Sequence, residues 1–118
     1  MGVVTEDEAQ WYGVRCVFAV GRSPDAVGRT YEERVTVWRA RTAAEAVERA
    51  EAEAREYVAA IDEPTEAHLG LAQSFRMAEP PGDGAEVFSL MRTSDLAPGD
   101  YLDRFFDTGD ERQRPLEG

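Results

Sequence analysis

The chain has 118 residues, 42% of them apolar, and a formal net charge of −11 at pH 7, which suits one domain with a sizeable core. The acidic balance argues against nucleic acid binding, which needs clustered Lys and Arg. No apolar run approaches the roughly 20 residues of a membrane span, and the start of the chain lacks the basic and apolar regions of a signal peptide, so we expect a cytoplasmic protein.

The first half of the chain predicts a flexible acidic tail over residues 1–10, followed by two strands. Residues 11–20, WYGVRCVFAV, alternate in polarity, as a strand with one buried side does. Residues 21–30 are rich in turn formers and predict a long hairpin loop. Residues 31–41 predict the second strand, with Val35 and Val37 on the face of Tyr31 and Glu33. Its other face carries Arg34, Thr36 and Trp38.

Residues 42–61 predict a long amphipathic helix. Thr42 and Glu45 have the spacing of a capping box, in which each side chain accepts a hydrogen bond from the other's backbone amide. Pro64 disfavours helical geometry at Glu63 and ends the helix there. The apolar positions fall within an arc of about 120° at the helical repeat. They are Ala46, Val47, Ala50, Ala54, Tyr57, Val58 and Ile61.

The second half predicts a strand over residues 69–77, a turn over 79–84 and a fourth strand over 86–92 that is apolar on both faces. A short helix should start at Pro98 and end before Gly109, with a flexible tail over 110–118. The fold class is therefore α+β in ββαββα order, a single domain over residues 11–109. We expect a four-stranded, mostly antiparallel sheet covered by both helices.

Two lone residues are the first candidates for chemistry. His68 is the only imidazole and could act as a general base or metal ligand, but a surface histidine at a strand end is the commoner case. Cys16 lies on the apolar side of a strand, where a thiol packs as a small hydrophobe. We expect no catalytic residue, metal or cofactor.

A set of polar residues on the second strand is the other candidate site. Glu33 shares a face with apolar residues and needs a partner, for which Arg39 is on the same face. The simpler interpretation is an ion pair at a strand end. The sharper one is a small-ligand pocket lined by Tyr31, Glu33 and Arg39.

Charge gathers on the long helix. Residues 42–63 hold seven acids and two arginines, a net charge of −5. Once the apolar side is buried, Glu45, Glu48 and Glu56 should face outward and attract a basic partner.

Three segments carry a family resemblance: YEER (31–34), EVFSLMR (86–92) and YLDRFFDTG (101–109). With the opening WYGVR, they resemble the bacterial family catalogued as domain of unknown function 4288. The resemblance spans roughly residues 11–112. It implies a stand-alone α+β module, and it carries over no assigned activity, cofactor or catalytic residue.

Two functions therefore stay open. One is a non-catalytic interaction module of the accessory or immunity type, which presents an acidic surface to a basic protein and associates with itself, most simply as a homodimer. The other is a small-ligand-binding protein or enzyme with the Tyr31, Glu33 and Arg39 pocket.

Overall fold

A computed structural model describes residues 8–20, 30–60 and 67–111 of the chain. The expected hairpin loop at 21–30, the helix end at 62–64 and most of both tails lie outside the described residues. The elements in chain order are β1 (Gln10–Val20), β2 (Thr30–Ala40), α1 (Ala43–Ala60), β3 (Ala67–Arg76), α2 (Pro98–Tyr101) and the π-helical turn η2 (Leu102–Phe106). The α+β class is confirmed.

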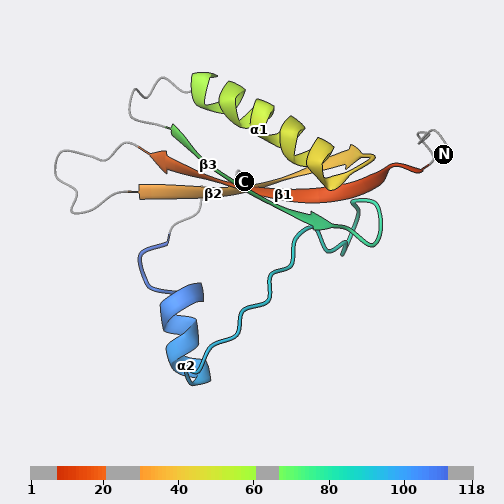
Figure 1. Cartoon of the computed structure of the whole chain (residues 1–118). Helices are drawn as coiled ribbons and strands as arrows, with labels where there is room; N and C mark the ends of the chain where they lie inside the picture. The colour runs from red at the N-terminus through yellow and green to blue at the C-terminus, as the bar shows by residue number, and fades with distance from the viewer. Residues whose placement is uncertain (1–7, 21–29, 61–66, 112–118) are drawn as a thin grey trace.

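The three strands form an antiparallel sheet in the order β2-β1-β3, with β1 in the centre (Figure 1). Gly13 of β1 lies opposite Val37 on one side and Phe75 on the other, and this fixes the register of both pairs. The β1–β3 ladder is interrupted between Cys16 and Phe18. Gly70 stands in the part of β3 opposite that interruption.

Helix α1 lies across one face of the sheet (Figure 1). The Glu45 backbone N–H donates to Thr42 Oγ1 at 3.0 Å, so the expected Thr42 cap is confirmed. The helix faces the sheet with alanines, which let it approach closely. The core formed by α1, β1 and the end of β2 consists of Tyr12, Val14, Cys16, Phe18, Ala40, Ala46, Ala50 and Ala54.

The two sides of β2 are used differently. Even-numbered residues such as Arg34, Thr36 and Trp38 are partly buried beneath α1, whereas odd-numbered residues are exposed. Val35 and Val37 are 43% and 38% exposed. The apolar alternation in β2 therefore points away from the helix. We call the sheet face opposite α1 the outer face.

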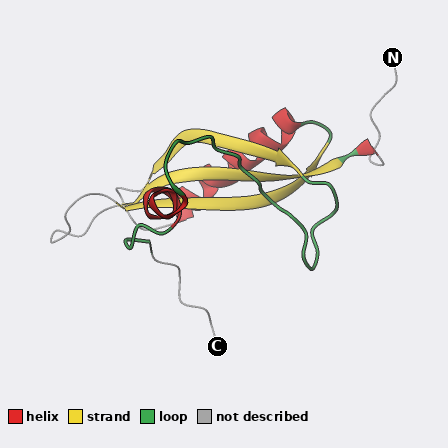
Figure 2. Ribbon diagram, turned by 90° about the horizontal axis from the view of Figure 1, so that it is seen from below, coloured by secondary structure: helices red, strands yellow, loops and turns green. Residues whose placement is uncertain are grey.

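The expected fourth strand is wrong, because residues 86–92 form no strand in the described chain. The segment runs across the outer face instead of along a sheet edge (Figure 2). A Cβ on Gly13 would lie 1.6 Å from the Val87 carbonyl oxygen, so the backbone of this segment rests on β1. Phe88 lies 6.2 Å from the ring of Phe75, centroid to centroid. Phe88 thus packs on the sheet, whereas Leu90 and Met91 of the same segment are exposed.

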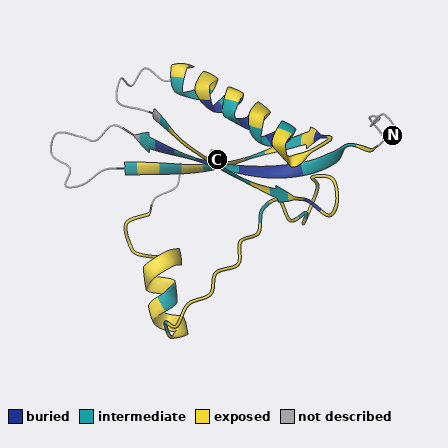
Figure 3. Cartoon of the chain, in the orientation of Figure 1, coloured by how far each residue is buried: buried dark blue, intermediate teal, exposed yellow. Residues whose placement is uncertain are grey.

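The expectation that both helices cover the sheet is also wrong for the second one. The helix begins at Pro98 as expected. However, α2 and η2 contact only each other among the elements of the fold. Figure 3 shows this region almost wholly exposed. None of the described helices is long and apolar enough to cross a membrane.

Candidate functional site

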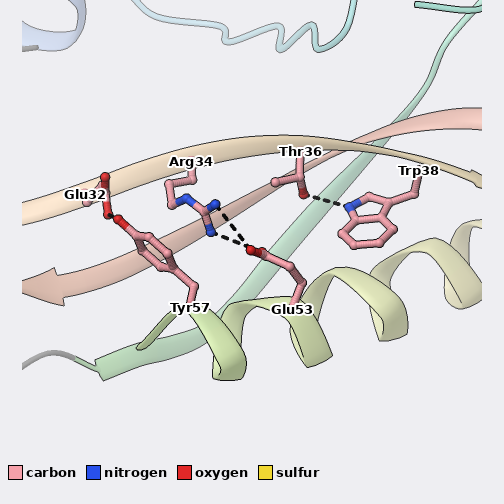
Figure 4. A network of polar contacts seen from close by, with 6 residues as sticks. All are labelled: Glu32, Arg34, Thr36, Trp38, Glu53 and Tyr57. Carbon is pink, nitrogen blue, oxygen red and sulfur yellow. Dashed lines mark hydrogen bonds and ion pairs between the residues drawn. The ribbon is translucent and has the colours of Figure 1, made fainter. Parts of the chain in front are cut away.

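A polar layer lies between β2 and α1 (Figure 4). The Arg34 guanidinium donates to both carboxylate oxygens of Glu53, at 3.1 and 3.4 Å. It also lies 3.7 Å from the ring centroid of Tyr57, a cation–π distance. The Tyr57 hydroxyl donates to Glu32 Oε1 at 2.7 Å. This arrangement joins the helix to the strand and keeps the Arg34 charge paired.

Cys16 is buried in the core below this layer, 4% exposed. Burial raises the pKa of its thiol, the nearby carboxylates of Glu51 and Glu53 raise it further, and Arg34 opposes them. A protonated buried thiol is a poor nucleophile. The geometry therefore suits packing and gives Cys16 no evident catalytic use.

The raised pKa of Cys16 predicts a pH dependence of stability. The folded state keeps the thiol proton at a pH where the unfolded chain loses it. At neutral pH both states keep the proton and the free energy of unfolding is at its full value. As the pH rises above the ordinary thiol pKa of roughly 8.5, the unfolded chain loses the proton first and the free energy of unfolding falls. Urea unfolding of wild type and Cys16→Ala from neutral pH to about pH 10 should therefore show the wild type losing stability relative to the variant. Parallel profiles would contradict the thiol's burial.

His68 lies at the margin of the same core, with its side chain 11% exposed. Its ring stands 5.4 Å from the Phe18 ring, and its Nε2 lies 3.9 Å from Glu51 Oε2. Neither ring nitrogen has a hydrogen-bond partner among the described residues. In that same part of the chain no group of three His, Cys, Asp or Glu side chains gathers as metal ligands.

The three glutamates expected to face outward lie on the solvent side of α1. Glu48 and Glu56 are exposed and Glu45 is half-buried beside the cap. Two further charges of the helix are engaged with the sheet: Glu53 with Arg34, and Arg49 with the carbonyl oxygen of Arg39 at 2.7 Å. The outward acidic surface of α1 is therefore narrower than the total charge of the helix suggests.

The structure does not bring Tyr31, Glu33 and Arg39 into one pocket. Tyr31 pairs with Ala19 at one end of β2 and Arg39 with Trp11 at the other. Eight residues of strand separate them by roughly 27 Å. Glu33 is 61% exposed and its Oε1 lies 3.4 Å from an Arg15 nitrogen.

An open depression lies near Arg39 at the far end of the sheet. It has a volume of about 340 Å³ and includes Trp11, Arg39, Met77 and Pro80 in its lining. Arg39 and Glu79 are the charged residues in its lining.

Exposed apolar side chains form the feature that the sequence did not reveal. Leu69 and Leu71 of β3 are exposed, whereas their neighbours His68 and Ala72 contact the core. We define the outer patch as Tyr31 (56% exposed), Val35 (43%), Val37 (38%), Leu69 (50%) and Leu71 (50%). The alternation of residues 31–37 and 69–71 contained this signal, but sequence alone could not say which side the helix covers.

The second exposed surface is the arm, residues 89–107, which includes α2 and η2. Its large side chains are Leu90, Met91, Leu102, Phe105 and Phe106, between 42% and 96% exposed. Patches of this kind on a small domain usually mark interaction surfaces.

Comparison of the chain with protein-family models, with curated proteins and with solved structures finds no match. The resemblance to domain of unknown function 4288 therefore stays a prediction.

Proposed function

We propose that this protein is a non-catalytic interaction module of the accessory or immunity type, which binds a basic protein and associates with itself. The observation that carries the proposal is the pair of exposed apolar surfaces, the outer patch and the arm. A folded domain keeps such surfaces when a partner covers them. Of the titratable groups near the core, Cys16 is packed among apolar residues and Glu53 is paired with Arg34.

We place the binding site for the basic partner on the solvent side of α1. Glu45, Glu48 and Glu56 stand there, on the helix face opposite the buried alanines. The overall charge of −11 adds a long-range attraction for a basic protein. The α1 surface and the outer face are on opposite sides of the sheet, so the basic partner and a second copy of the chain do not compete for one site.

Charge reversal tests the α1 surface. In the triple variant Glu45→Arg, Glu48→Arg and Glu56→Arg, association with a basic partner should slow by about tenfold or more at low salt, because electrostatic attraction sets the encounter rate. Partners are first isolated with immobilised wild-type protein and purified. Association rates are then measured by surface plasmon resonance over a range of salt concentration.

The matched control is Glu79→Arg, Asp83→Arg and Glu86→Arg, which changes the net charge equally on exposed residues outside the helix. It should slow association less than the α1 variant does. The proposal fails if the purified partner is acidic, or if its association rate changes neither with salt concentration nor with the α1 substitutions.

A further inference from the structure

The segment that joins β3 to the arm is fixed to the sheet at its two ends. We call this segment, residues 78–88, the strap. Just before it, Met77 is buried and its backbone N–H donates to the Trp11 carbonyl oxygen at 2.9 Å. At its other end the strap crosses the outer face, where Phe88 lies against Phe75 (Figure 2). Between these two points the strap is exposed apart from the half-buried Ala85.

The strap shares no backbone hydrogen bond with a strand in the part of the chain that the structure describes. Its own backbone bond is internal, from the Ala85 N–H to the Gly82 carbonyl oxygen at 3.0 Å. A segment with few buried contacts and solvent-exposed backbone opens locally at a much lower free energy than the whole fold. The contacts at Phe88 therefore decide whether the strap stays on the sheet.

Phe88 and the residue before it rest on three residues of the outer face, Gly13, Arg15 and Phe75, which we call the seat. The Val87 carbonyl occupies the space that a side chain on Gly13 would fill. The ring of Phe88 lies 6.2 Å from the Phe75 ring, centroid to centroid. The Arg15 guanidinium lies 5.3 Å from the Phe88 ring centroid, within cation–π range.

The seat is held in place by the sheet itself. Arg15 Nη1 donates to Glu33 Oε1 of β2 at 3.4 Å, and its Nη2 donates to Gln73 Oε1 of β3. Neither bond involves the strap. When Phe88 leaves, Arg15 therefore keeps its position and its charge stays paired, so the seat remains ready for the ring to return.

The arm depends on this contact for its position. Residues 89–97 lead away from the sheet (Figure 1), and α2 and η2 contact each other and no strand. The arm is braced internally, since Arg92 Nη1 donates to the Tyr101 hydroxyl at 2.9 Å and its guanidinium lies 4.2 Å from the ring centroid of Phe105. The braced arm can move as one piece when the strap leaves the sheet.

We infer that the strap is a latch with two states, set by whether Phe88 occupies the seat. In the latched state the strap covers Gly13 and Phe75 and holds the arm near the sheet. In the released state the middle of the outer face is bare and the arm swings from Met77. This is a movement within one chain, and it does not depend on the proposed basic partner or on self-association.

The latch sets how far the arm can reach. With Phe88 seated, residues 89–97 tether the arm helix to the sheet, which is at most roughly 30 Å of extended chain. With Phe88 lifted, the tether runs from residue 78 to residue 97 and extends to at most roughly 65 Å. The two states therefore differ in a distance that can be measured.

Two nitroxide labels measure this distance by pulsed electron paramagnetic resonance. One is placed at Ala52→Cys on the solvent side of α1 and the other at Asp100→Cys on the arm helix, since both residues are exposed. Cys16 is buried and stays unlabelled. The labelled chain is diluted into excess unlabelled chain, so that only distances within one chain are recorded. The wild type should give one main, short distance.

Phe88→Ala should broaden the distance distribution toward longer values and raise the released fraction by about tenfold or more, because the ring contacts with Phe75 and Arg15 are lost. Gly13→Ala should act in the same direction, since the added Cβ pushes the Val87 carbonyl from the seat. The matched control is Phe106→Ala, which removes the same atoms from an exposed ring of the arm and should keep the wild-type distances.

Four results would overturn the inference. Wild-type distances in Phe88→Ala would show that the ring does not hold the strap, and equal broadening in Phe106→Ala would show that the arm is held by its own apolar side chains. A wild type as broad as Phe88→Ala would mean that the arm is never latched. Global unfolding of Phe88→Ala in circular dichroism would make Phe88 a core residue instead of a latch.

Discussion

Replacing Phe18 with alanine is expected to lower the free energy of unfolding by about 3–5 kcal/mol, the usual cost of truncating a buried phenylalanine. Phe18 is fully buried and meets Tyr57 edge-on, with ring centroids 5.3 Å apart. It also lies beside His68 and beneath Arg34. Truncation would leave a cavity where β1, β3 and α1 meet. Urea unfolding followed by circular dichroism measures the loss.

Phe106→Ala is the matched control, since it removes the same atoms from a side chain that is 75% exposed. At concentrations where the chain is monomeric, this change should alter the free energy of unfolding by no more than about 0.5 kcal/mol. Equal costs at the two positions would show that the core is not centred on Phe18.

Gly13→Ala should separate the C-terminal segment from the sheet. The added Cβ would lie 1.6 Å from the Val87 carbonyl oxygen, and a backbone atom has to move to make room. We expect a cost of about 1–3 kcal/mol, as for other overpacked sites. Nuclear Overhauser contacts between the rings of Phe75 and Phe88 should be lost, while those between β1 and β2 are kept.

Gly82→Ala serves as its control, because a Cβ at that position meets no atom within 4 Å. It should leave both the stability and the contacts between Phe75 and Phe88 unchanged. Unchanged stability and unchanged Phe75–Phe88 contacts in Gly13→Ala would contradict the contact between Val87 and β1.

Local periodicity predicted the first three strands and the long helix, because each of these elements has one side in the core. The expected strand at 69–77 is observed as β3, Ala67–Arg76. The Thr42 cap was readable because it depends on four consecutive residues. The segment 86–92 was not readable in this way, since two apolar sides fit either a central strand or a chain that crosses a sheet. Only the path of the backbone over Gly13 distinguishes them.

The candidate site residues show the same difference between what local periodicity predicts and what depends on distant contacts. Helical periodicity placed Glu48 and Glu56 outward correctly, since it needs only the buried side of α1. The period of two placed Tyr31 and Arg39 on one face, but it says nothing about their separation along the strand. Arg34 was read as a polar residue of β2. Its place under the helix, stacked on Tyr57 and paired with Glu53, depends on contacts between distant parts of the chain.

The irregularity in β3 also affects how the chain resists aggregation. β3 is an edge strand, and an open edge can recruit further strands without limit. Gly70 has a φ of 81°, a left-handed conformation that glycine adopts readily, and it lies where the β1–β3 register shifts. A strand approaching the open side of β3 would meet an interrupted row of amides and carbonyls. The β3 edge is therefore a poor template for fibril growth, although apolar side chains of the same strand, Leu69 and Leu71, are exposed.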